Sequence, residues 1–159
     1  MVPSNSINAC GGASAGLPIG PRFAGVEITV EIRPITAEDI EGFHRAVDAV
    51  ARERKYLALL EALPLASTRK FVLENIAKGN PQFVVMADGS VVGWCEVVRL
   101  DRTAHAHAGV LGMGLLPLFR GQGHGRKLVE ASLQAARLAG FSRVDLTVHA
   151  DNSRAIALY

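Results

Sequence analysis

Hydrophobic and polar residues follow one another along the first half of the chain in a pattern that predicts a strand and then helices. Residues 26–35 alternate and are rich in β-branched side chains, which predicts a first strand. Residues 36–54 carry apolar side chains at helical spacing behind Thr36, a candidate cap. Residues 55–64 predict an extension of this helix or a short second one, and residues 65–80 predict a further helix.

The clearest local pattern lies in residues 82–100. Two apolar, β-branched runs are joined by Asp88-Gly89, a pair that suits the positive φ angles of a tight turn. This pattern predicts two antiparallel strands. Residues 105–117 predict another strand, but three glycines break its alternation and indicate a bulge or the close approach of another backbone.

The last part of the chain predicts a helix over residues 123–139, a strand over 142–150 and a final helix over 151–159. The predicted order is therefore β, α, α, β, β, β, α, β, α. The hairpin makes part of the sheet antiparallel, and the later strand-helix-strand crossover makes another part parallel. We expect an α/β fold with a mixed sheet, and a ligand site outside the carboxyl ends of the parallel strands.

Length and composition fit one globular domain. The chain has 159 residues, of which 49% are hydrophobic and 20% charged. Residues 1–25 are rich in Gly, Ser, Ala and Pro, which predicts a flexible tail before a single domain at 26–159. No apolar run approaches the roughly eighteen residues that a membrane span requires, so we expect no membrane association.

Charge and cysteine content narrow the class of ligand. A net charge of +2 is too small to indicate nucleic acid, so any anion site must be local. Cys10 and Cys95 lie far apart and suggest neither a disulfide framework nor a zinc site, which favours a reducing cytoplasm. His105 and His107 form an H-x-H pair without a nearby cysteine, and we expect no metal there.

A glycine-rich stretch, FRGQGHGRKL at residues 119–128, carries the main chemical signal. A strand that turns through glycines into a helix offers unpaired backbone N–H groups and the positive end of the helix dipole to an anion such as a diphosphate. Arg120, Arg126 and Lys127 add positive charge. The spacing matches neither the P-loop nor the G-x-G-x-x-G pattern of dinucleotide-binding folds.

Arg120, Gly123 and Gly125 do match the pattern R/Q-x-x-G-x-G/A, and Asn152 and Tyr159 follow in the arrangement N-x-x-A-x-x-x-Y. Over residues 82–159 the chain resembles the GNAT superfamily of N-acetyltransferases. The resemblance implies a mixed, mostly antiparallel central sheet flanked by helices. Relatives continue with two more strands, so we expect a shortened chain, or a homodimer in which a second copy completes the sheet edge.

The resemblance also implies acetyl-CoA as co-substrate and assigns residues to it. Backbone groups of Met113, Gly114 and Leu115 would pair with the pantetheine arm, and Asn152 would contact the same region. Tyr159 would donate a proton to the departing thiolate. Main-chain amides of the glycine-rich stretch would hold the pyrophosphate. The residues of this stretch expected to bind the cofactor are Arg120, Gly121, Gln122, Gly123, His124, Gly125 and Arg126.

The general base is less defined. Many relatives place a glutamate on the strand after the long helix, where this chain has Thr147. The remaining candidates are Glu96, His105 and His107, with Glu96 slightly ahead of His107, and a water-relayed proton transfer would also suffice. Each residue also has a simpler interpretation: Glu96 as an outward-facing strand carboxylate, Asn152 as a helix cap, and Tyr159 as a packing residue.

These observations together predict a cytoplasmic N-acetyltransferase that moves acetyl directly from acetyl-CoA to a primary amine, in a ternary complex and without metal. Residues 36–81, the part of the chain expected to bind the acceptor, carry mixed charge. As the acceptor, we favour a small molecule or amino acid over a protein N-terminus or lysine. Two other classes stay open: a non-catalytic CoA-binding or interaction module, and a mononucleotide-binding protein that uses the same loop.

Overall fold

The computed structural model describes residues 22–23, 26–100 and 106–159. Two short strands, β1 (Arg22–Phe23) and β2 (Val26–Glu27), pair antiparallel at the start of this part. The tail expected at residues 1–25 lies outside the described residues, apart from β1. The remaining elements are β3 (Val30–Pro34), α1 (Ile40–Arg52), α2 (Leu65–Ala77), β4 (Gln82–Ala87), β5 (Ser90–Arg99), β6 (Ala108–Leu115), α3 (His124–Leu138), β7 (Arg143–Asp145) and α4 (Ser153–Leu158).

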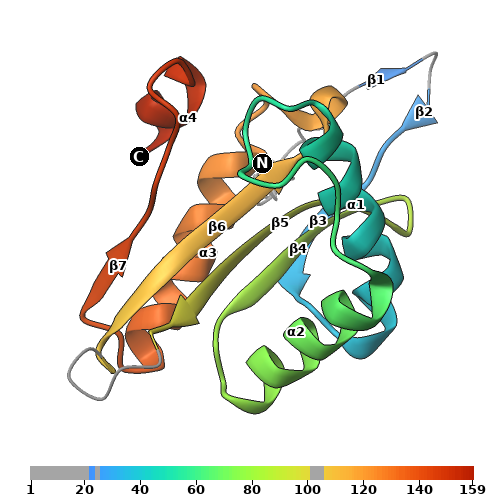
Figure 1. Cartoon of the computed structure of the whole chain (residues 1–159). Helices are drawn as coiled ribbons and strands as arrows, with labels where there is room; N and C mark the ends of the chain where they lie inside the picture. The colour runs from blue at the N-terminus through green and yellow to red at the C-terminus, as the bar shows by residue number, and fades with distance from the viewer. Residues whose placement is uncertain (1–21, 24–25, 101–105) are drawn as a thin grey trace, which may run out of the picture.

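Five strands form the central sheet in the order β3-β4-β5-β6-β7. The first three pairings are antiparallel and only β6–β7 is parallel, so the predicted mixed, mostly antiparallel sheet is confirmed. Helices α1 and α2 lie on one face of the sheet and α3 lies on the other (Figure 1). From β3 onward the order of helices and strands is the predicted one, and the short strands β1 and β2 precede it.

Two apolar clusters hold the helices to the sheet. On the α3 face, Cys95 and Val97 of β5 are buried in one cluster with Leu128 of α3. On the α1/α2 face, Trp94 of β5 is buried with Phe43 of α1, and the two rings meet edge to face with centroids 5.8 Å apart. Successive residues of β5 therefore point to opposite faces, as the pleat of a strand requires.

The hairpin between β4 and β5 turns as predicted, with positive φ angles of 45° at Asp88 and 78° at Gly89. The bulge predicted within residues 105–117 is wrong, since β6 pairs with β5 in continuous register. Two of its glycines serve close packing instead. A Cβ on Gly112 would overlap the carboxyl of Glu96, and a Cβ on Gly114 would overlap the indole of Trp94.

The helix predicted for residues 55–64 is also wrong. Helix α1 ends at Arg52, and Arg54 has a positive φ of 54° that turns the chain. The segment then folds back along α1, because Nε2 of His44 donates to the carbonyl oxygen of Leu63 at 2.9 Å and a carboxylate oxygen of Asp48 accepts from a backbone N–H of this segment at 3.0 Å. Polar side chains of α1 thus satisfy backbone groups that a helix would have paired internally.

Two predicted strands are shorter in the structure. Residues 26–35 divide into β2 and β3, because β2 turns aside to pair with β1. The strand predicted over residues 142–150 contains only β7, whose ladder with β6 has three residue pairs. Beyond Asp145 the chain bends away from β6 toward α4 (Figure 1).

Candidate active site

The early end of the β6–β7 ladder leaves one side of β6 open. The last pair is Val110 with Asp145, whereas β6 continues to Leu115. We call Leu111–Leu115, on the side that faces away from β5, the open edge of β6. Among the residues that the structure describes, no strand pairs with this edge.

The hydrogen-bond alternation of β5 and β6 shows which backbone groups face the open edge. Leu100 N donates to Ala108 O at 3.1 Å and Leu116 N donates to Val92 O at 2.8 Å, so the even-numbered residues of β6 bond to β5. The N–H and C=O groups of Met113 and Leu115 therefore face outward. Gly114, expected with them as a ligand of the pantetheine arm, instead directs its backbone groups toward Trp94.

The glycine-rich loop follows β6 and leads into α3. Gly121 and Gly123 have positive φ angles of 73° and 84°, and Gly123 caps the helix. The first amides of the helix, at His124, Gly125 and Arg126, have no acceptor within it, since the first helical bond runs from Lys127 N to Gly123 O. These amides and the positive end of the helix dipole form an anion site beside the open edge.

Side chains in this loop do not all face outward. Gln122 Nε2 turns back and donates to Leu118 O at 2.7 Å. His124 is only 3% exposed, and its Nε2 has no hydrogen-bond partner in the described part of the chain. Burial lowers the pKa of His124, and Lys127 lowers it further. Only the backbone of His124 and Gln122 is placed to meet an anion, whereas Arg126 and Lys127 are exposed.

Arg120 makes contacts that its sequence motif did not suggest. Its Nη atoms donate to both carboxylate oxygens of Glu53 at 2.8 and 2.5 Å, and its Nε donates to Leu115 O at 2.8 Å. The guanidinium also lies 4.7 Å from the ring centroid of Tyr56. Arg120 thus joins the end of β6 to the end of α1 and to the segment after it. The sequence alone does not predict the contacts with Glu53 and Tyr56, because no local pattern links these residues to residue 120.

Helix α4 brings Asn152 and Tyr159 toward the loop. Asn152 caps the helix, since its Oδ1 accepts from Ala155 N at 3.1 Å. A Cβ on Gly125 would lie 3.4 Å from Leu158, 3.5 Å from Leu115 and 3.7 Å from Met113, so α4, α3 and the open edge meet at this point. Partial burial, and then the neighbouring Cys95 thiol, raise the pKa of Tyr159 to about 12, although 46% of the residue is exposed.

Glu96 lies on the α1/α2 face of the sheet, opposite Gly112. Its Oε2 is buried and has no hydrogen-bond partner among the described residues. Burial raises the pKa of Glu96 to about 8. Because Gly112 precedes Met113, the carboxyl lies beside the open edge. Cys95, the neighbour of Tyr159, is paired with Met113 on the opposite face. Glu96 and Tyr159 therefore approach the open edge from opposite faces of the sheet.

His107 is not brought together with these residues. It is exposed and precedes β6, and its carbonyl oxygen accepts from Ser142 N at 2.9 Å near the start of β7. Six residues of strand separate it from Met113, a distance of about 20 Å. His105 lies outside the described residues. Thr147, where many relatives carry a glutamate, is exposed beyond the end of β7.

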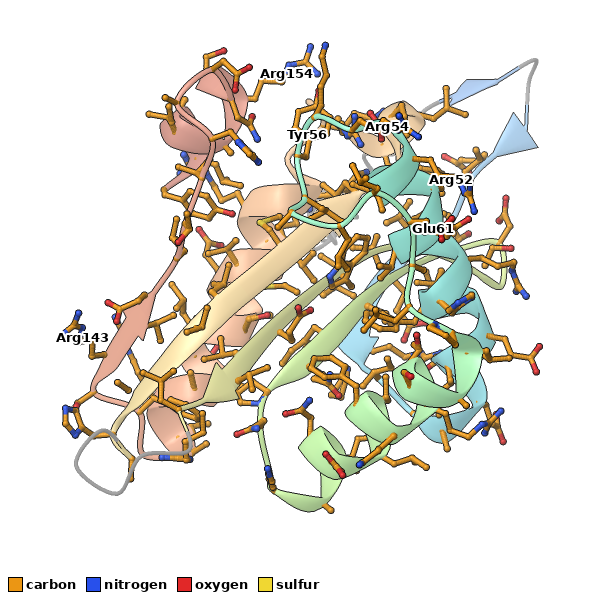
Figure 2. All side chains as sticks on the ribbon, viewed as in Figure 1. Arg52, Arg54, Tyr56, Glu61, Arg143 and Arg154 are labelled. Atoms are coloured by element: carbon orange, nitrogen blue, oxygen red, sulfur yellow. The ribbon has the colours of Figure 1, made fainter. Side chains whose placement is uncertain are left out.

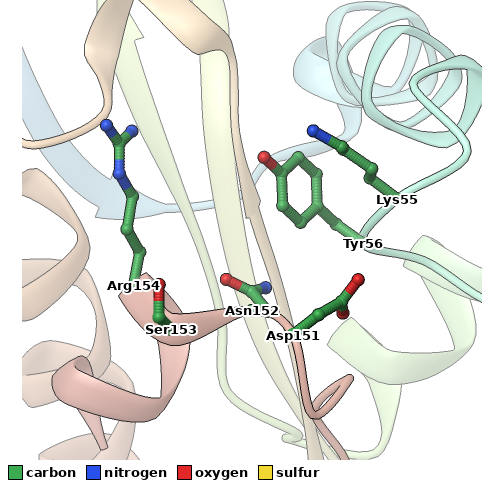
Figure 3. A pocket seen from close by; sticks show the side chains of 6 residues that line it. All are labelled: Lys55, Tyr56, Asp151, Asn152, Ser153 and Arg154. Carbon is green, nitrogen blue, oxygen red and sulfur yellow. The ribbon is translucent and has the colours of Figure 1, made fainter.

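A cavity of about 210 Å³ lies between the segment after α1 and the start of α4 (Figure 3). Tyr56 borders the cavity from the segment after α1, and Arg154 borders it from α4. Arg143, the first residue of β7, lies away from the cavity (Figure 2). The lining of the cavity is polar and carries both signs of charge. The lining residues are Lys55, Tyr56, Asp151, Asn152, Ser153 and Arg154.

Within the described residues, no three His, Cys, Asp or Glu side chains gather as a metal site would require. None of the helices in the described ranges has the length and apolar character needed to cross a membrane.

The open edge, the glycine loop and the mixed sheet define an acyltransferase type of fold. The family model for the acetyltransferase (GNAT) family matches residues 47–159, which is more than half of the chain. The chain therefore belongs to the GNAT acetyltransferase family. The comparison with curated proteins gives no match.

Solved structures share this fold. A phosphinothricin acetyltransferase of the GNAT superfamily from Sinorhizobium meliloti, in complex with acetyl-CoA, has a TM-score of 0.76 at 20% identity, over 82% of this chain and 71% of that one. A putative acetyltransferase from Salmonella typhimurium with its cofactor acetyl-CoA has a TM-score of 0.76 at 17% identity, over 81% and 75%. A ribosomal-protein-alanine N-acetyltransferase from Brucella melitensis has a TM-score of 0.75 at 21% identity, over 80% of each chain.

Proposed function

We propose that this protein transfers an acetyl group from acetyl-CoA directly to a primary amine of a small molecule or amino acid. Membership of the GNAT family supports the reaction class, and two similar structures hold acetyl-CoA. The observation that carries the proposal is the open edge of β6, with which no described strand pairs and which immediately precedes an anion-binding loop. A cytoplasmic location and a homodimer stay predictions.

The residues present fit the co-substrate along its length. Amides from Gly121 to Arg126 would hold the diphosphate, supported by the exposed charges of Arg126 and Lys127. The outward N–H and C=O of Met113 and the N–H of Leu115 would pair with the amide groups of the pantetheine arm, as a strand would, while Leu115 O already accepts from Arg120 Nε. Asn152 borders the cavity between the segment after α1 and the start of α4.

The chemistry requires a polarised carbonyl, an acceptor for the proton of the amine and a donor for the leaving sulfur. The reaction forms a C–N bond and breaks the C–S bond of the thioester. An outward N–H at Met113 or Leu115 donates to the carbonyl oxygen, a contribution of roughly 3 kcal/mol by analogy with oxyanion holes. Glu96 accepts the proton that the amine loses, and Tyr159 supplies a proton to the sulfur.

The test is a panel of amines incubated with acetyl-CoA, in which thiol release is measured alongside calorimetric titration with CoA. Thiol release that requires an amine, together with the acetylated amine detected by mass spectrometry, is the expected result. Binding of CoA without turnover on small amines, peptide N-termini or lysine peptides would instead support a non-catalytic CoA-binding module. Failure to bind CoA would overturn both.

A further inference from the structure

Three residues form a row across the α1/α2 face of the sheet beside the proposed reaction centre. Gln82 of β4 is opposite Glu96 of β5, and Glu96 is opposite Gly112 of β6. Val97 N donates to Pro81 O at 2.9 Å, so Gln82 and Glu96 form a non-hydrogen-bonded pair, the arrangement that brings cross-strand side chains closest. Gly112 contributes no side chain to the row.

Three side-chain polar atoms of this row are buried and have no hydrogen-bond partner in the described part of the chain. Gln82 is 5% exposed, and within the described ranges neither its Nε2 nor its Oε1 has a hydrogen-bond partner. The same holds for Oε2 of Glu96. Buried polar atoms are nearly always satisfied in folded proteins, so three on one adjoining pair indicate a polar group that arrives from outside.

The position of the row connects it to the reaction. The carboxyl of Glu96 leans over Gly112, where any Cβ would overlap it, and Gly112 adjoins Met113 of the open edge. Glutamine differs from glutamate in offering a donor and an acceptor on one rigid amide. The row therefore presents two oxygens to an amine and one N–H group to an oxygen.

We propose that Gln82 and Glu96 together hold an acceptor whose oxygen atom is separated from its amine by two carbons, as in an α-amino acid amide or a 1,2-amino alcohol. This inference rests on the proposed acetyl transfer. Glu96 Oε2 and Gln82 Oε1 accept from the amine N–H groups, and Gln82 Nε2 donates to the neighbouring oxygen. A plain alkylamine leaves Gln82 Nε2 without a partner and is a poorer acceptor.

The test compares L-alaninamide with n-propylamine in the full chain and in Gln82→Leu, with rates expressed per concentration of free amine. We expect kcat/KM for L-alaninamide to fall at least about tenfold in Gln82→Leu, mainly through KM, while n-propylamine changes less than about twofold. The control is Gln134→Leu, a substitution of an exposed glutamine on α3 that leaves both amines unchanged.

Thermal unfolding without any substrate gives an independent readout. Leucine at position 82 removes two unsatisfied polar atoms, so Gln82→Leu raises the Tm by a few degrees, on the order of 3 °C. A purely structural glutamine would instead lower it, and that result overturns the inference.

The outcomes separate this inference from the proposed function. Equal losses for the two amines in Gln82→Leu, or equal activity of the two in the unmodified chain, overturn the role of Gln82 and leave acetyl transfer intact. If no amine is acetylated, calorimetric titration of the CoA-loaded protein decides: L-alaninamide binding that Gln82→Leu abolishes supports the site, and no binding overturns it.

Discussion

Glu96 is half-buried with its Oε2 shielded from solvent, and this burial controls when the carboxyl group can act as a base. Burial raises its pKa to about 8, so it is largely protonated at neutral pH. We expect kcat/KM for the free amine to rise about tenfold per pH unit below this value and to level off above it. A profile between about pH 6 and pH 10 checks this. A profile without this limb would show that another group takes the proton.

The same burial makes Glu96 a source of instability at alkaline pH. Its pKa in the fold lies above the ordinary value of 4.5, so the unfolded chain loses the proton first and stability falls as pH rises from 4.5 toward 8. We expect Glu96→Gln to unfold with a free energy higher by roughly 4 kcal/mol near pH 9 and equal to the unmodified chain near pH 4. Denaturant titration measures this, with the exposed Glu130→Gln as control.

The role that we propose for Tyr159 is the opposite one, because an acid must keep its proton until the thiolate forms. A pKa of about 12 keeps the phenol protonated throughout the working range. We expect Tyr159→Phe to lower kcat about 100-fold and to change the Kd for acetyl-CoA less than about twofold. Single-turnover kinetics and titration separate the two effects. A variant with unchanged kcat would return Tyr159 to the role of a packing residue.

At the scale of elements, Arg120 connects the glycine-rich stretch after β6 to the segment after α1. Its bonds to Glu53 and Leu115 hold the segment after α1 against the end of β6. We expect Glu53→Gln and Arg120→Gln both to speed hydrogen exchange in residues 53–64 and to raise KM for the amine several-fold, with CoA affinity unchanged. If Arg120 binds phosphate instead, only Arg120→Gln weakens CoA binding.

The sequence was sufficient for those elements whose signals are local. Asp88-Gly89 defined the hairpin, and the glycine-rich stretch located the start of α3, because turn residues and helix caps act over a few positions. The segment 55–64 was misassigned because distant side chains, His44 and Asp48, satisfy its backbone. The early end of β7 was missed for a similar reason: an apolar pattern does not show where a neighbouring strand diverges.

The candidate site, too, could be predicted from the sequence only where its signals are local. Motif spacing identified the loop and Tyr159, and Glu96 was named among several possible bases. The pairing of Gln82 with Glu96 depends on strand register, and the ion pair of Arg120 with Glu53 spans 67 positions. Contacts of this kind form only when the chain has folded, so no local sequence pattern predicts them.

At the scale of the whole molecule, the proposed cofactor site joins β6, α3 and α4, which pack together around Gly125. A ligand that contacts all three stabilises the folded chain against global unfolding. At a concentration of about 100 times its Kd, acetyl-CoA should add about 2.7 kcal/mol and raise the Tm by roughly 5 to 10 °C. Differential scanning fluorimetry measures this. ATP at the same concentration should give a smaller shift, and an equal one would favour a mononucleotide site.

The outward groups of Met113 and Leu115 belong to the peptide backbone, which every amino acid supplies in the same form. Mutations along β6 can therefore exchange side chains while the surface offered to the acyl carrier stays the same. Selection on the amine can then reshape neighbouring residues such as Gln82 independently. Solved structures at 20–21% identity share this fold, while their names indicate acceptors as different as phosphinothricin and a ribosomal-protein alanine.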